Sequence, residues 1–239
     1  MSALELINVL TEYQHMFAPV VPFDFLKDKL ALFDFTSANQ TIKEDIFNDT
    51  KEFTVYIDHA LKENGARYGI GGYNENRTLY SRSKVFDASK GEEEPRRLHL
   101  GTDIWGKPNT PVMAPWDGIF HSFAFNNDYG DYGVTIILSH TCKGINFHTL
   151  YGHLSLDSIK NIAEGDHIRK GDVFAEFGIP AENGHWPPHL HFQIIKDMGD
   201  WKGDYPGVCK FSEKEKYLFN CPDPDLVLQL NQYLLKASV

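Results

Sequence analysis

The sequence predicts a mainly β domain flanked by helical segments, an α+β protein overall. Short β-branched and aromatic segments recur over residues 98–196, broken by Gly, Pro and Asn at intervals of about 8 to 12 residues, as in a sandwich or barrel. Helical periodicity precedes this region, and a further helical pattern follows it. We therefore expect a partly helical N-terminal extension at residues 1–90, a β domain at 91–200 and a C-terminal extension at 201–239 that ends in a helix.

Two amphipathic helices are expected in the N-terminal extension. The first should end before Pro19 and Pro22. Its apolar residues are Leu4, Leu6, Ile7 and Leu10. The second begins with a capping box of Asp49 and Glu52 and ends at Gly65. Its apolar stripe consists of Phe53, Tyr56, Ile57, Ala60 and Leu61.

The central region follows two irregular stretches. Gly69 to Arg77 is a glycine-rich connection, and residues 90–97 form a charged loop whose charge indicates a solvated edge. Beyond them, Val134 to Leu138 is a near-continuous apolar strand, and Ile145 to Tyr151 alternates as a half-buried strand does.

The last helix is expected near the C-terminus. Asp223 should cap it, with Pro224 at the first helical position. The residues expected to face inward are Leu226, Leu230, Tyr233 and Leu234.

Composition excludes several classes of protein. The 239 residues are 42% hydrophobic and 23% charged, which is ordinary for a globular chain. The chain shows no internal repeat and no run of about 18 apolar residues, so we expect neither a repeat array nor a membrane span. A net charge of -10 repels phosphate backbones, so nucleic acid is not an expected partner.

Cysteine usage and the N-terminus bear on the cellular compartment. Cys142, Cys209 and Cys221 are an odd set without a Cys-x-x-Cys spacing, so we expect reduced thiols rather than disulfides or a thiolate zinc knuckle. The chain has no Lys or Arg before Lys27 and so lacks the basic start of a secretory signal. The expected location is cytoplasmic for the chain as written, and exported if a leader has been removed.

Two pairs of residues, one of two histidines and one of a histidine and an aspartate, could carry chemistry. In a strand, His189 and His191 share one face while the apolar residues between and after them point to the other. His99 and Asp103 lie four residues apart, but Gly101 argues against a helix. In a straight strand they would be roughly 13 Å apart, too far for one zinc ion, so a bend near Gly101 is needed.

A third histidine ends an alternating strand. His153 falls on the same parity as Tyr151 and follows a glycine that would let a substrate approach. It suits either a general base or a surface histidine at a hairpin end, and the spacing does not decide between them. Each of these signals is weak alone.

Together and in this order, the motifs carry more information. They are His99…Asp103, then Tyr151-Gly-His153-Leu-Ser, then Pro-His189-Leu-His191-Phe. The stretches between them agree with the same pattern: Thr110 to Gly118, Tyr132-Gly133, Glu164 to Gly171, and Phe177-Gly178. Over about residues 98–196 the chain resembles the LytM/lysostaphin-type zinc metallopeptidases, the bacterial glycyl-glycine and peptidoglycan endopeptidases.

The resemblance implies a catalytic zinc site. By it, His99, Asp103 and His191 bind one Zn²⁺ per chain, while His153 and His189 are the catalytic histidines. Three protein ligands leave an open position for water, which marks a catalytic rather than a structural site. Zinc would lower the pKa of that water and polarise the scissile carbonyl. Which of the two histidines acts as the general base stays open.

The resemblance also implies a fold and a substrate class. The fold is a largely antiparallel sheet with hairpins, of the duplicated-hybrid-motif type, folded over a narrow groove for slim peptides with Gly or D-amino acids. Tyr151 would either add a hydroxyl donor near the oxyanion or be an aromatic residue of the core. Trp186 would stack on a substrate or cover the core from a bulkier loop than the family's. Asn74 or Asn76 would occupy the open zinc position, as an upstream asparagine does in latent members.

Two other functions compete with a peptidoglycan endopeptidase. One is a catalytically silent relative that binds or regulates a cell-wall hydrolase or a peptide partner, and the intact set of five site residues argues against it. The other is a phosphotransfer domain in which His153 and His189 accept phosphate, but Asp103 favours zinc. The expected partner is a peptide or muropeptide, and no oligomeric state is predicted. A cytoplasmic enzyme would act on imported or recycled wall peptides or on another small peptide.

Overall fold

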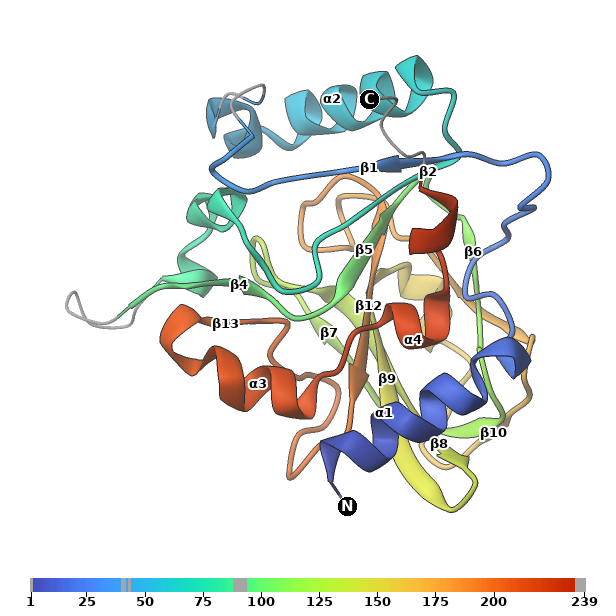
Figure 1. Cartoon of the computed structure of the whole chain (residues 1–239). Helices are drawn as coiled ribbons and strands as arrows, with labels where there is room; N and C mark the ends of the chain where they lie inside the picture. Colours follow the sequence, from blue (N-terminus) through green and yellow to red (C-terminus); the bar gives the residue numbers. More distant parts are fainter. Residues whose placement is uncertain (1, 40–41, 43, 88–93, 235–239) are drawn as a thin grey trace.

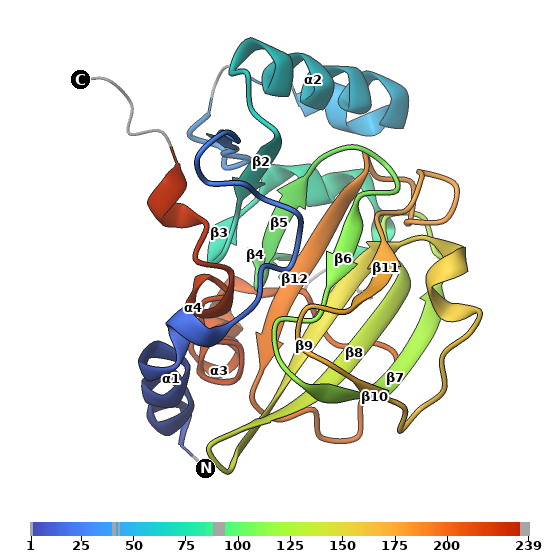
Figure 2. The ribbon, with the colours of Figure 1, turned by 90° about the vertical axis from the view of Figure 1, so that its right-hand side faces the viewer.

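A large sheet forms the framework of the molecule. The computed structural model describes residues 2–39, 42, 44–87 and 94–234, and within them eight strands pair in the order β1-β2-β5-β12-β9-β8-β7-β10 (Figures 1 and 2). The strands are β1 (Leu30–Leu32), β2 (Tyr68–Gly71), β5 (Thr102–Trp105), β7 (Gly118–Asn126), β8 (Gly133–Cys142), β9 (Ile145–Leu154), β10 (His167–Ile168) and β12 (His189–Ile195). All neighbouring pairs are antiparallel except β1 and β2, which run parallel at one edge. The predicted mainly β, largely antiparallel core is confirmed.

Two smaller sheets complete the β structure of the described residues. The first pairs β6 (Pro111–Met113) with β11 (Val173–Glu176), and the second has the order β13-β4-β3. Its strands are β3 (Glu75–Asn76), β4 (Arg96–His99) and β13 (Val208–Lys210). Arg96 and Arg97 therefore lie in a strand, not in the predicted loop, whose residues 90–93 lie outside the described residues. The predicted domain boundaries near residues 90 and 200 stay a prediction. Strands pair across each of them, β2 with β5 across the first and β4 with β13 across the second.

Helix α2 lies on its own at one end of the molecule, apart from the other three helices (Figures 1 and 2). They are α1 (Ala3–Glu12), α2 (Thr50–Glu63), α3 (Lys214–Asn220) and α4 (Asp225–Leu228). Both predicted N-terminal helices are present, and the Asp49 carboxylate accepts the backbone N–H groups of Lys51 and Glu52 at the start of α2. Leu6 buries itself in α1 as predicted, but Leu4 is 65% exposed. None of the helices that the structure describes is long and apolar enough to cross a bilayer.

The C-terminal helix is shorter than predicted. Asp223 accepts the N–H of Asp225 at its start, but α4 ends after one turn because Gln229 adopts a left-handed conformation with φ of 52°. The Asp225 carboxylate then accepts the N–H of Leu230, a local bond that replaces the helical one. Leu230 is buried as predicted, whereas Tyr233 is 36% exposed. Helix α3 was not predicted.

The two faces of strand β12 have different surroundings, and one of them lies in the main hydrophobic core. Leu190, Phe192 and Ile194 are fully buried in one apolar cluster with Leu6 and Leu10 of α1. The histidines of the same strand project from the other face, as the period of two requires. The predicted alternation is confirmed, and β12 carries the site described next.

Candidate metal centre and active site

Strand pairing brings the His99 and Asp103 pair next to the His189 and His191 pair. Across the ladder between β5 and β12, Asp103 lies directly opposite His191, and Trp105 lies opposite His189. His99 ends β4 in the three-stranded sheet, and the chain enters the main sheet at Thr102. The change of sheet between them is the bend predicted near Gly101.

Gly101 is required by close approach. A Cβ atom at this position would lie 2.5 Å from Cε1 of His191 and 2.8 Å from the carbonyl oxygen of Phe192. Only glycine leaves room for the imidazole ring, so the bend and the position of His191 depend on the same residue.

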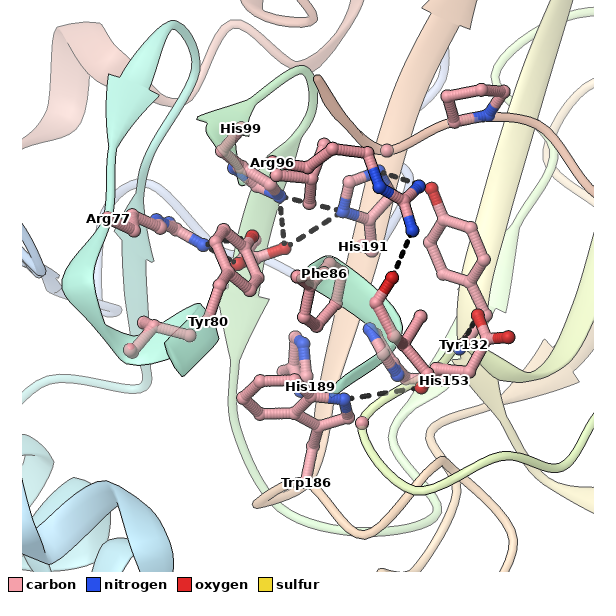
Figure 3. A pocket seen from close by; sticks show the side chains of 18 of the residues that line it. Arg77, Tyr80, Phe86, Arg96, His99, Tyr132, His153, Trp186, His189 and His191 are labelled. Atoms are coloured by element: carbon pink, nitrogen blue, oxygen red, sulfur yellow. Dashed lines mark hydrogen bonds and ion pairs between the residues drawn. The ribbon is translucent and has the colours of Figure 1, made fainter. Parts of the chain in front are cut away.

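Three donor atoms converge at this point. Nε2 of His99 lies 3.3 Å from Oδ1 of Asp103, and Nδ1 of His191 lies 3.2 Å from the same oxygen. The two imidazole nitrogens are 2.8 Å apart. Figure 3 shows the imidazole rings of His99 and His191 turned toward each other. The three residues are at most 2% exposed. Among the described residues they form one group able to hold a metal ion.

Backbone and side-chain acceptors fix which ring nitrogens carry hydrogen. His99 Nδ1 lies 3.0 Å from the carbonyl oxygen of Gly72, which can only accept. His191 Nε2 lies 2.9 Å from Oε1 of Gln193, whose amide nitrogen donates to the carbonyl oxygen of Pro206. The hydrogens therefore sit on these outer nitrogens. His99 Nε2 and His191 Nδ1 are left with lone pairs that face each other.

This donor set fits a divalent cation. Two lone pairs at 2.8 Å and a carboxylate oxygen repel one another unless a positive charge lies between them. Asp103 Oδ1 is buried and has no hydrogen-bond partner, as expected of an atom kept for a metal. Three ligands about 2.1 Å from a tetrahedral zinc ion would lie roughly 3.4 Å from each other, close to the distances found here.

His153 reaches the site through an irregularity in its strand. The register between β8 and β9 shifts where Val134 pairs with Leu154 and Ile136 pairs with Tyr151, and His153 has φ of 65°. This bulge turns His153 away from the face on which Tyr151 lies. Its ring centroid is 4.1 Å from that of His189. The predicted common face for Tyr151 and His153 is wrong because the bulge breaks the alternation.

His189 is held by packing behind it. The Trp105 indole stacks on its ring at 3.9 Å with an interplanar angle of 15°, and Phe53 of α2 packs against Trp105 at 5.6 Å. Nδ1 of His189 donates to the carbonyl oxygen of Pro187, and Nδ1 of His153 donates to that of Asn183, each at 2.8 Å. Each histidine therefore presents Nε2 with a free lone pair.

The five residues lie in one pocket of about 130 Å³. Trp186 lines one side, and Tyr132 contributes its ring 5.1 Å from that of His191. The opposite wall comes from the two short 3-10 turns η3 (Thr78–Arg82) and η4 (Lys84–Phe86), through Tyr80 and Phe86 (Figure 3). A segment of the N-terminal region thus closes a pocket whose floor is the main sheet.

The electrostatics suit a metal-binding state at neutral pH. Burial lowers the pKa of His99 to about 3 and that of His189 to about 4, and it holds the pKa of His153 well below the ordinary value. Burial opposes ionisation of Asp103, but its interactions with the His99 ring and with the charged guanidinium of Arg77 keep its pKa well below its usual range. Neutral imidazoles and a charged carboxylate are the forms that bind a metal.

Comparison with known proteins agrees with this geometry. Residues 97–203 match the family model described as Peptidase family M23. This segment is a peptidase M23 domain. The predicted resemblance to lysostaphin-type metallopeptidases is thereby confirmed.

Three similar proteins illustrate the match of the M23 domain. The L-Ala-D-Glu endopeptidase of Bacillus subtilis (strain 168) is 31% identical over 140 residues, which cover 54% of this chain and 40% of that protein. An uncharacterized metalloprotease of Haemophilus influenzae is 33% identical over 98 residues, 41% of this chain and 18% of that protein. The catalytic domain of lysostaphin from Staphylococcus simulans has a TM-score of 0.39 at 19% identity, covering 69% of this chain and 96% of that domain. The chain thus spans less than half the length of the first two relatives.

Three of the residues considered for the active site lie outside the pocket of the M23 domain. Tyr151 is fully buried in the core on the other face of the sheet, between Phe174 and Phe192, and accepts a hydrogen bond from Thr149. Asn74 and Asn76 are exposed and do not line the pocket. Asn74 has φ of 58°, so it serves the turn into β3. Tyr151 is therefore the core aromatic that was one of its two predicted roles, and the predicted asparagine at the open zinc position is wrong. Trp186 lines the pocket and is 3% exposed.

Sequence reasoning missed three residues around the M23 site. Arg77 contacts Asp103, Gln193 contacts His191, and Tyr132 packs on His191. The Tyr132-Gly133 motif was a usable signal, because it belongs to the pattern that carried the resemblance. Arg77 and Gln193 had no such signal, since their partners are set by strand pairing.

Proposed function

We propose that the chain is a zinc-dependent metalloendopeptidase that hydrolyses peptide bonds in peptidoglycan-type peptides containing Gly or D-amino acids. One observation carries the proposal. Two buried imidazole lone pairs and the orphaned Oδ1 of Asp103 face a common point beside two further histidines. A buried arrangement of this kind is stable only around a cation, and His153 and His189 would serve chemistry next to it.

Zinc held by His99, Asp103 and His191 would polarise the scissile carbonyl and lower the pKa of a water molecule. The chain itself supplies the proton transfers. His153 and His189 each keep an uncharged Nε2 in the pocket, because Nδ1 donates to a backbone carbonyl. One of them would accept the proton of the attacking water and return it to the leaving amine, and the other would orient the reacting groups.

The pocket walls support a slim peptide as substrate. Tyr80, Phe86 and Trp186 narrow a pocket whose site residues are at most 6% exposed, so bulky side chains beside the scissile bond would clash. Links with Gly or small D-residues meet this limit. The B. subtilis relative is named for cleaving a bond between L-Ala and D-Glu, which supports peptides with D-residues as the first class to test.

The test joins metal content with hydrolysis. Elemental analysis of untagged protein should find about one zinc per chain in wild type and a loss of zinc in His191→Ala, with His185→Ala as control because His185 is an exposed histidine of the adjacent loop. Wild type and His185→Ala should cleave muropeptides or glycine-rich peptides, and mass spectrometry of the fragments detects this cleavage.

Two results would contradict the proposal. A folded wild type that takes up no zinc even when zinc is supplied would remove the metal site. Full zinc occupancy without cleavage of any muropeptide or glycine-rich peptide would favour the silent module that binds a partner in the same pocket.

A further inference from the structure

Arg77 is a buried charge next to the metal centre. It is 1% exposed and lies outside the M23 segment, in the chain that leads into the wall of the pocket. Its Nη1 donates to Oδ2 of Asp103, and its Nε donates to Oε2 of Glu75. Nη1 also lies 3.3 Å from the hydroxyl of Tyr80 (Figure 3). Burial of a guanidinium without partners would destabilise the fold, so these partners must compensate for its lost hydration.

The two oxygens of Asp103 have different surroundings. Oδ2 is taken by Arg77, while Oδ1 has no hydrogen-bond partner and faces His99 Nε2 and His191 Nδ1. A carboxylate free to rotate would offer both oxygens to a cation. Here a charge-assisted bond holds one oxygen on the far side and leaves the other for the metal.

Arg77 is itself held in place. Glu75 binds its Nε, and its guanidinium carbon lies 5.5 Å from the ring centroid of Phe35. Gly72 makes room for it, because a Cβ there would lie 1.7 Å from Nη2. The carbonyl of the same Gly72 accepts the N–H of His99. A single short segment, Gly72 to Arg77, therefore orients two of the three ligands.

We infer that Arg77 is a positioning residue of the metal centre, which holds Oδ2 of Asp103 so that the carboxylate presents only Oδ1 to the ion. The inference rests on the proposed zinc site. The inference extends the zinc site beyond residues 97–203, which match the M23 family, to residues 72–77. No metal-ligand spacing in the sequence points to these residues. Arginine suits the role because its planar fork bridges Glu75 and Asp103 at once, which a lysine ammonium cannot do in the same geometry.

The test measures the metal, not turnover. Arg77→Met should weaken zinc binding about 10- to 100-fold in competition with a chromophoric chelator. It should also change the visible absorption spectrum of the Co²⁺-loaded protein, because a carboxylate released from Arg77 alters the coordination number. Arg77→Lys keeps the charge without the fork and should recover only part of the affinity.

Folding is controlled in two ways. Arg77→Met removes the cation that faces the half-buried Glu75 and leaves that carboxylate only its bond from the backbone N–H of Phe35. The double variant Arg77→Met/Glu75→Gln removes the uncompensated charge, and circular dichroism checks that both variants fold. Arg82→Gln removes a part-buried guanidinium five residues further along the chain. Its hydrogen bonds go to Thr50, Tyr129 and the carbonyl oxygen of His185, and it lies over the ring of Trp186 without contacting a candidate ligand. This variant should leave zinc affinity and the Co²⁺ spectrum unchanged.

Each outcome has one meaning. Folded Arg77 variants with wild-type zinc affinity and an unchanged Co²⁺ spectrum would overturn the inference and show that the ion pair only ties the segment to the sheet. The proposed function would survive that result. A wild type that binds neither zinc nor Co²⁺ would instead overturn the metal site, and this inference with it.

Discussion

Gly101→Ala should disturb the metal centre without changing any ligand. The added Cβ would lie 2.5 Å from Cε1 and 2.6 Å from Nε2 of His191, and 2.8 Å from the carbonyl oxygen of Phe192, against ordinary contacts of 3.4 to 4 Å. Relief of this overlap requires the ring or the strand to move by about 1 Å, and overpacking of this kind costs about 1 to 3 kcal/mol.

Two measurements follow from that displacement. The melting temperature should fall by roughly 2 to 12 °C, since 1 kcal/mol corresponds to about 2 to 4 °C in a chain of this size. Zinc affinity should fall at least about 10-fold, because a zinc–nitrogen bond of about 2.1 Å does not tolerate a 1 Å shift of the ring. Thermal unfolding of metal-free protein and chelator competition measure the two effects separately.

Gly144→Ala is the matched control. Gly144 has φ of 78° and nothing within 4 Å of an added Cβ, so alanine there strains the backbone by about 1 to 2 kcal/mol but touches no part of the site. It should lower the melting temperature and leave zinc affinity unchanged. If Gly101→Ala binds zinc as wild type does, or if the two variants lose affinity equally, the close-packing argument is wrong.

Three further predictions concern catalysis, pH and local stability. His153→Ala and His189→Ala should each retain about one zinc but lose roughly 100-fold or more in kcat, measured on the best peptide substrate, and parallel loss of zinc would contradict the assignment. Burial lowers the pKa of His140 to about 4 from 6.5, so its contribution to stability is complete above pH 6.5 and is lost as pH falls towards 4. Between pH 7 and pH 5, urea unfolding of wild type should lose about 2 kcal/mol more than that of His140→Gln, and equal losses would refute this account. Asp49→Ala removes the N-cap of α2 and should cost about 1 kcal/mol in the same assay, with Asp58→Ala in the middle of that helix as the control.

Local patterns in the sequence predicted much of the frame. The alternation in β12 placed His189 and His191 on one face because the period of a strand is a property of the backbone alone. The Asp49 cap predicted the start of α2 for a similarly local reason. The bend near Gly101 followed from the reach of an extended chain, and the structure confirms it by the change of sheet between β4 and β5.

Predictions failed where pairing between distant segments decided the outcome. His153 and Tyr151 were expected to share a face, but a bulge against β8 turns the histidine into the pocket and leaves the tyrosine in the core. An asparagine was expected to reach the metal from the 69–77 stretch. The residue of this stretch that does contact a candidate metal ligand is Arg77, whose guanidinium donates to Oδ2 of Asp103.

Residue patterns alone predict the mainly β class, the two N-terminal helices, and the order of motifs that resembles a zinc peptidase. These depend on residues close together in the chain or on spacings kept within one segment. Which side chains meet depends on how distant segments pair in the folded chain. The register between β5 and β12 places Asp103 opposite His191, and the return of the N-terminal segment brings Arg77 and Tyr80 to the pocket. The physical reason is that a buried charge or lone pair is stable only beside its partner, and here each partner comes from another part of the chain.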